Sequence, residues 1–430
     1  MSTRRRPPGR QIEHTDTGCV VPSVVVESPA MKSIHHSGDS DPTSILVVLP
    51  TWVGDFVMAT PTLCAIRDRF RHTRITFLME PNLIDLAGGG PWMDDFVVWP
   101  EKSERSLLRK GFRRLASDLR RRRFDWAVLL SNSFRSALLV RLAGIARRIG
   151  YDRDGRGFLL SDRLPVKNRR KDRNEGATRQ CLAGAVSPSP FHPLTPVKLG
   201  ANLPVPPSRF VPLPLTEYLA DLAEAIGCPR PNDKLELFTT QDCDESVHAR
   251  LSGHGVADRH PLVVVSPGAK YGAAKCWMPG RFAELCDRLI ESQGALVLIT
   301  CGPGEHSIAR AIESAMNQTG VVLADPGLTL GEMKSLIRRC DLLISNDAGI
   351  RHFAKAFGVS VVTIFGPTHP EWTATSYELE RIVRVDVDCG PCQQRTCPLG
   401  HLDCMDRVSV DMVYGACQDL IALPARVVAG

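Results

Sequence analysis

One stretch of the chain decides the fold: Asp341-Leu-Leu-Ile-Ser-Asn-Asp-Ala-Gly-Ile-Arg-His-Phe-Ala-Lys-Ala-Phe-Gly-Val-Ser-Val-Val-Thr-Ile-Phe-Gly-Pro-Thr368. Its two ends, Leu342 to Ile344 and Val361 to Phe365, are short and apolar, and they have the content expected of buried parallel strands. The residues between them predict a polar turn followed by a helix. The pattern is therefore strand, turn, helix and strand, which is the repeating unit of an α/β fold.

The polar turn in this stretch is a candidate binding site for an anion. Asn346, Asp347 and Gly349 crowd the point where the helix is expected to begin. Such a turn leaves backbone N–H groups unpaired beside the positive end of the helix dipole, which suits the diphosphate of a nucleotide sugar. The alternative is that Asn346 or Asp347 only caps the helix, and the turn by itself does not decide between the two.

The composition limits the class of protein. A chain of 430 residues with 43% hydrophobic content can bury two ordinary cores, so we expect two domains. The 53 basic and 47 acidic residues give a net charge of +6, which suits a phosphorylated substrate or an anionic membrane surface. This excess is too small to indicate nucleic acid, and no nucleic-acid-binding motif supports that partner. No apolar run reaches the roughly 18 residues of a spanning helix, so we expect a soluble or peripheral protein.

The first 43 residues predict a disordered tail. They contain Arg4-Arg5-Arg6-Pro7-Pro8 and scattered polar residues, and the run Val24-Val25-Val26 is too short for the core of a signal peptide. We therefore expect a cytoplasmic protein. In that compartment, its 14 cysteines are expected to be thiols or metal ligands rather than disulfides.

A second candidate site lies at the start of the ordered chain. Ile45 to Leu49 predict a buried strand, and Pro50-Thr-Trp-Val-Gly-Asp55 leads from it into a helical pattern. Asp55 stands at the carboxyl end of the strand, where open α/β sheets bind their ligands. Its carboxylate can accept the proton of an attacking sugar hydroxyl, or it can simply cap the helix. The turn lacks the full Gly-x-Gly-x-x-Gly spacing, which disfavours an NAD-dependent oxidoreductase.

Two basic segments follow in the first half. Leu108, Phe112, Leu115 and Leu119 recur at helical spacing beside the basic run Arg120 to Arg123. Such a helix suits either anionic lipid headgroups or ordinary packing on its own sheet. Residues 167–211 are rich in Pro, Ser, Arg and Lys and predict a long insertion, which is either disordered or holds an acidic acceptor.

The second half repeats the sequence of strand, glycine-rich turn and helix. The strand Leu262 to Ser266 is followed by Pro267-Gly-Ala-Lys-Tyr-Gly-Ala-Ala-Lys275, whose glycines let backbone amides approach a phosphate. Lys270 or Lys275 can place an ammonium on a leaving diphosphate, although a lysine in a loop is usually only solvated. Glu305 follows the next strand and can accept hydrogen bonds from sugar hydroxyls, or it is only favoured by the first turn of a helix.

These motifs resemble those of glycosyltransferase family 9, the ADP-heptose:lipopolysaccharide heptosyltransferases, and especially the heptosyltransferase II branch. The resemblance rests on Trp52-Val-Gly-Asp55, Pro267-Gly-Ala269 with Gly272-x-x-Lys275-x-Trp277-x-Pro279, Asn346-Asp-x-Gly349-x-x-His352 and Phe365-Gly-Pro-Thr368. It covers nearly everything after the tail. The resemblance implies a GT-B fold of the α/β class, in which two Rossmann-like domains face a cleft. The acceptor would bind the first domain and the nucleotide sugar the second.

The resemblance also implies a reaction. Asp55 would be the general base that activates the acceptor hydroxyl, and Lys275 would bind the diphosphate. The reaction would be an inverting displacement at the anomeric carbon of ADP-heptose, with no cofactor and no metal. The helix dipole and the lysine would stabilise the departing ADP.

Four further residues would bind the donor by the same resemblance. Glu305 would hold the nucleoside or heptose hydroxyls, and Asp347 would meet the heptose hydroxyls. Gly349 and His352 would line the diphosphate end of the pocket.

The implied acceptor is the inner core of lipopolysaccharide, at the cytoplasmic face of the inner membrane, where the protein would bind peripherally. Two alternatives stay open. One is a family 9 enzyme that uses another nucleotide sugar or a protein or surface-glycan acceptor. The other is a non-catalytic nucleotide-sugar-binding protein, which the joint presence of Asp55, Lys275 and Asp347 disfavours.

The expected domain boundaries follow from these motifs. We expect the tail at 1–43, an acceptor-binding domain at 44–230 and a nucleotide-sugar-binding domain at 231–386. Residues 387–430 would form a cysteine-rich loop and a C-terminal helix that packs back on the first domain, as in GT-B proteins. In that loop, Cys389, Cys392, Cys397 and Cys404, with His401, are either ligands of a structural metal or reduced thiols.

Overall fold

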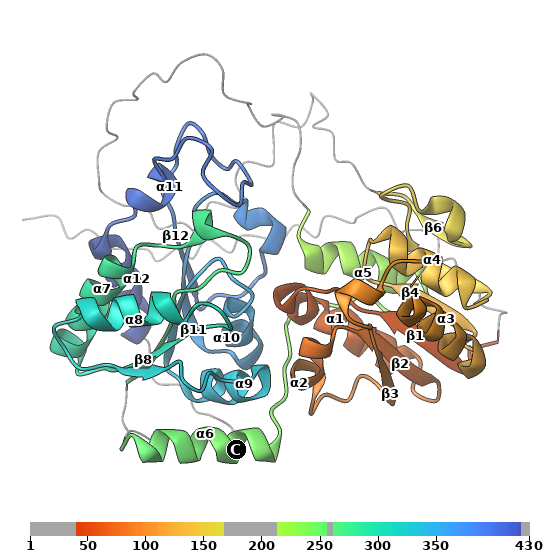
Figure 1. Cartoon of the computed structure of the whole chain (residues 1–430), viewed down its shortest axis with the longest axis horizontal. Coiled ribbons are helices and arrows are strands. Elements are labelled where there is room, and N and C mark those ends of the chain that lie inside the picture. The colour runs from red at the N-terminus through yellow and green to blue at the C-terminus, as the bar shows by residue number, and fades with distance from the viewer. Residues whose placement is uncertain (1–39, 108, 167–212, 256–260, 423–430) are drawn as a thin grey trace, which may run out of the picture. The chain divides into compact units, whose positions relative to one another are not determined.

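Two parallel six-stranded sheets organise the chain (Figure 1). The structure is a computed structural model that describes residues 40–107, 109–166, 213–255 and 261–422. The strands of the first sheet are β1 (Ser44–Val48), β2 (Arg74–Met79), β3 (Asp95–Val98), β4 (Trp126–Leu129), β5 (Arg147–Tyr151) and β6 (Asp162–Leu164). Those of the second are β7 (Leu262–Ser266), β8 (Leu296–Thr300), β9 (Val321–Leu323), β10 (Leu342–Asn346), β11 (Ser360–Ile364) and β12 (Glu380–Val383).

Both sheets have the same topology. The first has the order β3-β2-β1-β4-β5-β6, and the second has the order β12-β11-β10-β7-β8-β9. Counted from its own first strand, each sheet is ordered 3-2-1-4-5-6, which is the Rossmann order. The predicted α/β fold with two Rossmann-like sheets is therefore confirmed. In such sheets the ligand crevice lies at the carboxyl ends of the strands where the order reverses, here between β1 and β4 and between β7 and β10.

Helices connect the strands. In the first half they are α1 (Val53–Arg69), α2 (Ile84–Ala87), α3 (Lys110–Arg122), α4 (Phe134–Leu142) and α5 (Leu215–Ala225). In the second half they are α6 (Gln241–Gly253), α7 (Pro279–Gln293), α8 (His306–Ala315), α9 (Leu330–Arg339), α10 (Arg351–Phe357), α11 (Asp403–Asp406) and α12 (Val410–Ile421). Short 3-10 turns are η1 (Pro81–Leu83), η2 (Lys102–Glu104), η3 (Gly157–Leu159), η4 (Ala273–Lys275) and η5 (Pro370–Thr373).

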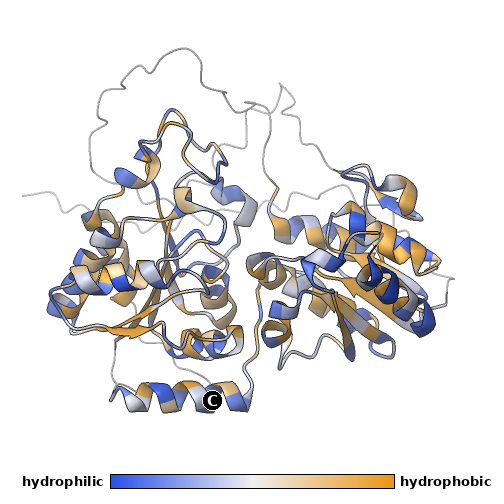
Figure 2. Ribbon diagram, viewed as in Figure 1, coloured by the Kyte–Doolittle hydropathy of each residue, from blue (hydrophilic) through white to orange (hydrophobic). Residues whose placement is uncertain are grey.

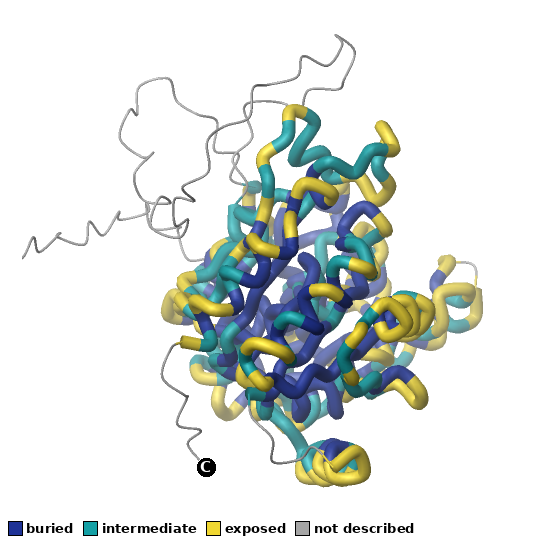
Figure 3. The backbone as a smooth tube through the Cα atoms, turned by 90° about the vertical axis from the view of Figure 1, so that its left-hand side faces the viewer, coloured by how far each residue is buried: buried dark blue, intermediate teal, exposed yellow. Residues whose placement is uncertain are grey.

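The central strands of both sheets are apolar and buried on both faces, as parallel sheets covered by helices require. Figure 2 shows these strands as predominantly hydrophobic, and Figure 3 shows the buried segments inside and the exposed ones on the outer helices. Three of the described helices begin with a side-chain cap. Ser133, Thr329 and Ser409 cap α4, α9 and α12 by accepting a hydrogen bond from a backbone amide three residues on.

The basic helix α3 packs on its own sheet. Its apolar residues Phe112, Leu115 and Leu119 are buried in the core of the first half. The interpretation of ordinary packing is therefore confirmed for the apolar stripe, and only the basic face is left for any lipid contact. Leu108 and the expected insertion at 167–211 lie outside the described residues.

The C-terminal helix lies on the second sheet. Val413, Cys417 and Leu420 of α12 join the core that covers this sheet, and α12 packs against α7, β11 and β12. The expectation that this helix packs back on the first domain is wrong for the described part of the chain. The apolar side chains of α12 find a matching surface on α7, directly beside their own sheet. Among the helices that the structure describes, none has the length and apolar content needed to cross a bilayer.

Candidate active site

Two glycines bring the switch points of the two sheets together. Gly54 opens α1 after β1, and Gly349 lies in the turn between β10 and α10. A Cβ atom on Gly349 would lie 2.8 Å from the backbone nitrogen of Gly54, and one on Gly54 would lie 3.1 Å from Cα of Gly349. A side chain at position 349 does not fit without a shift of the backbone, and one at position 54 would make a tighter contact than is usual. The close approach therefore requires glycine at 349 and favours it at 54.

Asp55 follows Gly54 in the first turn of α1, where it is half-buried. The N-cap residue of this helix is Trp52, so the alternative that Asp55 caps the helix is wrong. Burial raises the pKa of Asp55 from 3.8 to about 6, and the positive charge of Lys275 opposes this rise in part. Asp55 is then ionised at neutral pH but basic enough to accept a proton from a hydroxyl group.

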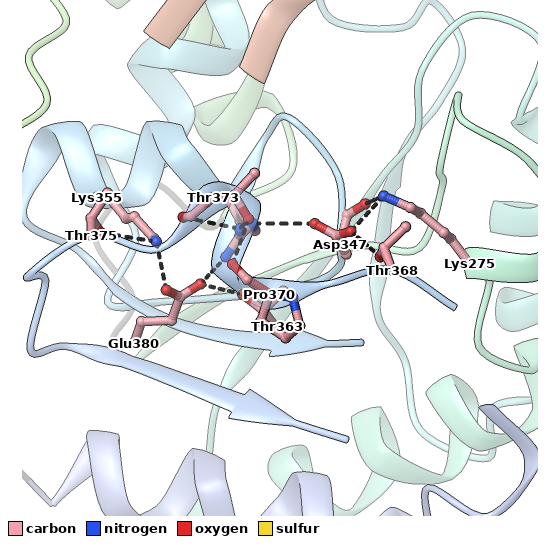
Figure 4. A network of polar contacts seen from close by, with 10 residues as sticks. Lys275, Asp347, Lys355, Thr363, Thr368, Pro370, Thr373, Thr375 and Glu380 are labelled. Carbon is pink, nitrogen blue, oxygen red and sulfur yellow. Dashed lines mark hydrogen bonds and ion pairs between the residues drawn. The ribbon is translucent and has the colours of Figure 1, made fainter. Parts of the chain in front are cut away.

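Lys275 and Asp347 form a buried ion pair on the second sheet (Figure 4). Lys275 ends η4, in the loop after β7, and Asp347 follows β10 directly. The Lys275 ammonium donates to Asp347 Oδ2 at 2.5 Å and to its backbone carbonyl oxygen at 3.2 Å. The Thr368 hydroxyl donates to the same carboxylate oxygen at 2.6 Å. The structure thus brings Lys275 and Asp347 together, with Asp55 within electrostatic reach of Lys275.

The polar residues of the turn before α10 do not cap this helix. Asn346 accepts a hydrogen bond from the backbone of Trp277 and donates one to the carbonyl of Pro267, so it ties β10 to the loop after β7. The N-cap residue of α10 is Ile350, and no side chain caps this helix. The capping alternative is therefore wrong for Asn346 and Asp347. The amides of Arg351, His352 and Phe353 are bonded to carbonyls three residues earlier, so these three amides already have partners.

Asp347 is held ionised by cations on two sides. Burial alone would raise its pKa, but the charges of Arg351 and Lys275 and the hydrogen bonds from Lys275 and Thr368 outweigh burial and lower it. Arg351 is not among the predicted site residues, yet it is fully buried and its Nε lies 3.5 Å from Asp347 Oδ1. The sequence offers no local signal for this pair, because Asp347 lies in the turn after β10 and Arg351 is the first residue of α10.

His352 and Gly349 lie at the contact between the two halves. His352 is buried, and burial, followed by the charges of Arg351, Lys355 and Lys275, lowers its pKa well below the usual value. The imidazole is therefore neutral. A Cβ atom on Gly54 would lie 3.3 Å from its Cδ2. The predicted role of His352 beside a diphosphate stays a prediction, and its visible contact is packing against Gly54.

Glu305 lies beside the glycine-rich loop after β7. It is the N-cap residue of α8, but its carboxylate accepts a hydrogen bond from the amide of Gly302, at 3.0 Å, rather than from the helix. A Cβ atom on Gly268 would lie 1.9 Å from Glu305 Oε2. Gly268 is therefore the residue that leaves room for this carboxylate. The predicted hydrogen bonds from Glu305 to a nucleoside or sugar are compatible with this position, and they stay a prediction.

The cysteine-rich loop supports the lysine loop. Tyr271 donates a hydrogen bond to the carbonyl of Gln393, and the amide of Ala274 bonds to the carbonyl of Arg395. The Lys275 ammonium lies 4.6 Å from the centroid of the Tyr271 ring, and the Arg395 guanidinium lies 5.3 Å from it. Within the described residues Arg395 has no carboxylate partner. Arg395 is thus a second cation beside the Tyr271 ring, and no sequence pattern predicts this contact.

The four cysteines of this loop are close enough to influence one another. Burial, followed by the charges of the neighbouring Cys389, Cys392 and Cys397, raises the pKa of Cys404 to about 11. All four are free thiols. In the part of the chain that the structure describes, no group of three or more His, Cys, Asp or Glu side chains is arranged to hold a metal ion. The arrangement therefore gives no support to the metal-site alternative.

Comparison with known proteins gives the same family as the motifs. A family model described as glycosyltransferase family 9 (heptosyltransferase) matches residues 112–175 and 208–403. The matched ranges contain all the predicted donor-site residues but not Asp55. They break inside the expected insertion.

The curated relatives are similar over most of their length. The lipopolysaccharide heptosyltransferase 2 of Salmonella typhimurium is 26% identical over 344 residues, which are 79% of this chain and 88% of the relative. The lipooligosaccharide heptosyltransferase 2 of Campylobacter jejuni is 22% identical over 86% of this chain and 96% of its own.

The same architecture is found among solved structures. A glycosyltransferase family 9 protein of Veillonella parvula superposes with a TM-score of 0.67 at 18% identity, over 88% of this chain and 97% of that one. The ADP-heptose lipopolysaccharide heptosyltransferase II of Escherichia coli superposes with a TM-score of 0.60 at 24% identity, over 87% and 99%. These likenesses support the GT-B form of the α/β fold.

Proposed function

Because the chain belongs to glycosyltransferase family 9, we propose that it transfers heptose from ADP-heptose to the inner core of lipopolysaccharide. The similarity to heptosyltransferases 2 over most of the chain supports this donor and acceptor. The observation that carries the proposal is the meeting of a weakly basic carboxylate with a buried lysine and aspartate. Asp55 lies in α1, which follows the first strand of the first sheet, and Lys275 and Asp347 lie in the loops after β7 and β10 of the second.

The proposed chemistry is a single displacement. The acceptor hydroxyl loses its proton to Asp55 while its oxygen attacks the anomeric carbon of the heptose from the face opposite the diphosphate. The bond from that carbon to the diphosphate oxygen breaks, and ADP leaves with the electron pair. The configuration at the carbon is inverted because the two bonds lie on opposite faces. The ammonium of Lys275 stabilises the charge that develops on the departing diphosphate.

The donor-binding roles follow the same arrangement. Lys275 binds the diphosphate, and Asp347 accepts hydrogen bonds from heptose hydroxyls. Glu305 binds the nucleoside or heptose hydroxyls, while Gly349 and His352 form the wall beside the diphosphate. The acceptor binds the half built on the first sheet, which carries Asp55. The domain boundaries at residues 43, 230 and 386 are part of this proposal.

The proposed acceptor also implies where in the cell the protein acts. An acceptor in the lipopolysaccharide core is anchored in the inner membrane, so we place the protein peripherally at its cytoplasmic face. The basic side chains Arg120 to Arg123 at the end of α3 supply positive charge for anionic headgroups, whereas the apolar residues of α3 are buried in the core. Sedimentation with anionic liposomes tests this location, and a variant neutralised at these arginines should bind less. Equal sedimentation of both proteins removes the membrane proposal.

The experiment that tests the function is a thermal-shift panel of ADP-, UDP- and GDP-sugars followed by turnover with the preferred donor. A ligand that binds only the native state raises its stability by mass action, so the preferred nucleotide gives the largest shift. We expect ADP-heptose to give this shift, Asp55→Ala to abolish turnover while it keeps donor binding, and Lys275→Ala to weaken donor binding. A preference for UDP or GDP replaces ADP-heptose as the donor, and wild-type turnover by Asp55→Ala removes the base assignment.

A further inference from the structure

A buried charge network extends from Asp347 away from the predicted ligand position. Arg351 and Lys355 of α10 both bind Glu380 at the start of β12, at 2.5 Å and 2.6 Å. The second terminal nitrogen of Arg351 bonds the hydroxyl of Thr373. Figure 4 shows Glu380 and Lys355 on one side of Asp347, with Lys275 on the other.

The burial of these groups makes their charge balance important. Arg351 is fully buried, Lys355 is 4% exposed, and the side chain of Glu380 is 8% exposed. A buried charge without a partner is strongly destabilising, so each carboxylate here needs a cation. With Lys275 and Asp347 included, the network has three cations and two carboxylates. One positive charge is therefore left over in this network, and the next carboxylate in reach is Asp55, which interacts with Lys275.

Lys275 is the cation that can be spared. Arg351 and Lys355 are held on Glu380, and Arg351 also compensates Asp347 through Nε. Lys275 has the most exposed side chain of the three cations, at 11%, and it lies on the side of Asp347 nearer Asp55. If Arg351 were absent, the charge of Lys275 would be needed to compensate Asp347.

We propose that Arg351, anchored by Glu380, is a positioning residue that compensates Asp347 and thereby frees Lys275 to bind the diphosphate of the donor. Donor binding then exchanges partners. The ammonium of Lys275 moves from Asp347 to the diphosphate, and the Oδ2 atom that it leaves becomes an acceptor for a sugar hydroxyl. Arg351 contacts neither the donor nor the reacting atoms. This inference rests on the proposed function, because it takes the diphosphate as the ligand of Lys275.

The experiment is a double-mutant cycle on ADP binding, measured by titration calorimetry with the full chain. Arg351→Gln removes the charge but keeps a hydrogen-bond donor for Glu380. We expect it to weaken ADP binding by about tenfold or more, because Lys275 is then retained by Asp347. Arg351→Lys keeps the charge and should bind ADP more tightly than Arg351→Gln does. Arg384→Gln, at an exposed arginine just after β12, is the matched control and should bind as the wild type does.

The decisive variant adds Asp347→Asn. Without the carboxylate Lys275 has nothing to compensate, so Arg351→Gln should no longer matter, and Asp347→Asn/Arg351→Gln should bind ADP as tightly as Asp347→Asn alone. A merely structural role for Arg351 predicts the same loss in both backgrounds, and that result overturns the inference. Because Arg351→Gln can fail to fold, the same cycle is measured with Arg351→Lys, which keeps the buried charge but replaces the guanidinium nitrogens that reach Glu380, Thr373 and Asp347 by one ammonium. A loss of ADP binding that disappears in the Asp347→Asn background supports the inference, and an equal loss in both backgrounds contradicts it.

The two proposals fail in different ways. If the wild type does not bind ADP, or if Lys275→Ala binds it equally well, the proposed donor site is wrong and the inference falls with it. If the wild type binds ADP through Lys275 but Arg351→Gln binds it equally well, only the role of Arg351 is wrong.

Discussion

Gly54 and Gly349 face each other so closely that a methyl group on Gly349 would lie 2.8 Å from the nitrogen of Gly54. Each glycine lies within two positions of a residue that takes part in the proposed reaction. Gly54 precedes Asp55, and Gly349 is two residues after Asp347. The distance between base and donor site is therefore set by a backbone contact rather than by flexible side chains. Small displacements at this contact should therefore lower kcat more than they lower the free energy of unfolding.

We predict that Gly349→Ala lowers kcat by about tenfold or more, because the added methyl group pushes α1 away from the turn before α10. Gly280→Ala is the matched control, since a Cβ atom there meets nothing within 4 Å. Steady-state kinetics on both variants checks the prediction. A Gly349→Ala enzyme with wild-type kcat contradicts the idea that this contact sets the geometry.

Asp55→Asn should inactivate the enzyme and stabilise the fold. The folded-state pKa of Asp55 is about 6, above its usual value of 3.8, so ionisation costs the folded state free energy. This cost is absent well below pH 3.8, grows as the pH rises towards 6, and is complete above it. Asparagine avoids it, and we expect a gain of up to about 3 kcal/mol near neutral pH. Denaturant unfolding at neutral pH and near pH 4 measures this gain, which should shrink at the lower pH. A variant less stable than the wild type at neutral pH contradicts the raised pKa.

The pH dependence of turnover should report the same carboxylate. A base with a pKa of about 6 loses its proton-accepting form below that pH, so kcat/KM should fall about tenfold per pH unit on the acid side. The measurement is kcat/KM from about pH 4.5 to pH 8 in a constant-ionic-strength buffer. An acid limb with a midpoint near 4 would show that Asp55 is not desolvated in the free enzyme.

Arg395→Ala should weaken ADP binding more than AMP binding. Arg395 shares the Tyr271 ring with Lys275 and has no carboxylate partner in the described chain, so its charge adds to the potential at the diphosphate. We expect a loss of about threefold to tenfold for ADP, measured by calorimetry. Arg384→Ala, an exposed arginine paired with Asp386, provides the comparison. Equal effects of the two substitutions would assign Arg395 to the general surface charge.

Gly268→Ala should displace Glu305. The new Cβ atom would fall 1.9 Å from Glu305 Oε2, so the carboxylate must leave its position beside Gly302. If Glu305 binds nucleoside or sugar hydroxyls, Gly268→Ala and Glu305→Ala should raise the donor KM by similar factors. The double variant should then have a donor KM close to that of either single variant. Additive losses would show that Gly268 and Glu305 act separately.

The order and type of the central elements were predictable because local sequence signals are sufficient for them. The runs at 45–49, 262–266 and 361–365 match β1, β7 and β11 to within one residue at each end. The edge strands were not predicted. β6 and β9 have only three residues each, and such short segments carry no periodicity that separates a strand from a loop.

The sequence by itself determined the α/β repeat and the residue types at the ends of β1, β7 and β10, because strand patterns and glycine-rich turns are local. It could not determine which of these residues meet. Only the tertiary structure decided that Lys275 pairs with Asp347, that Arg351 and Glu380 stand behind that pair, and that α12 covers the second sheet. The physical reason is that a buried charge takes its partner from whatever the packed chain brings within a few ångströms, however far away in the sequence.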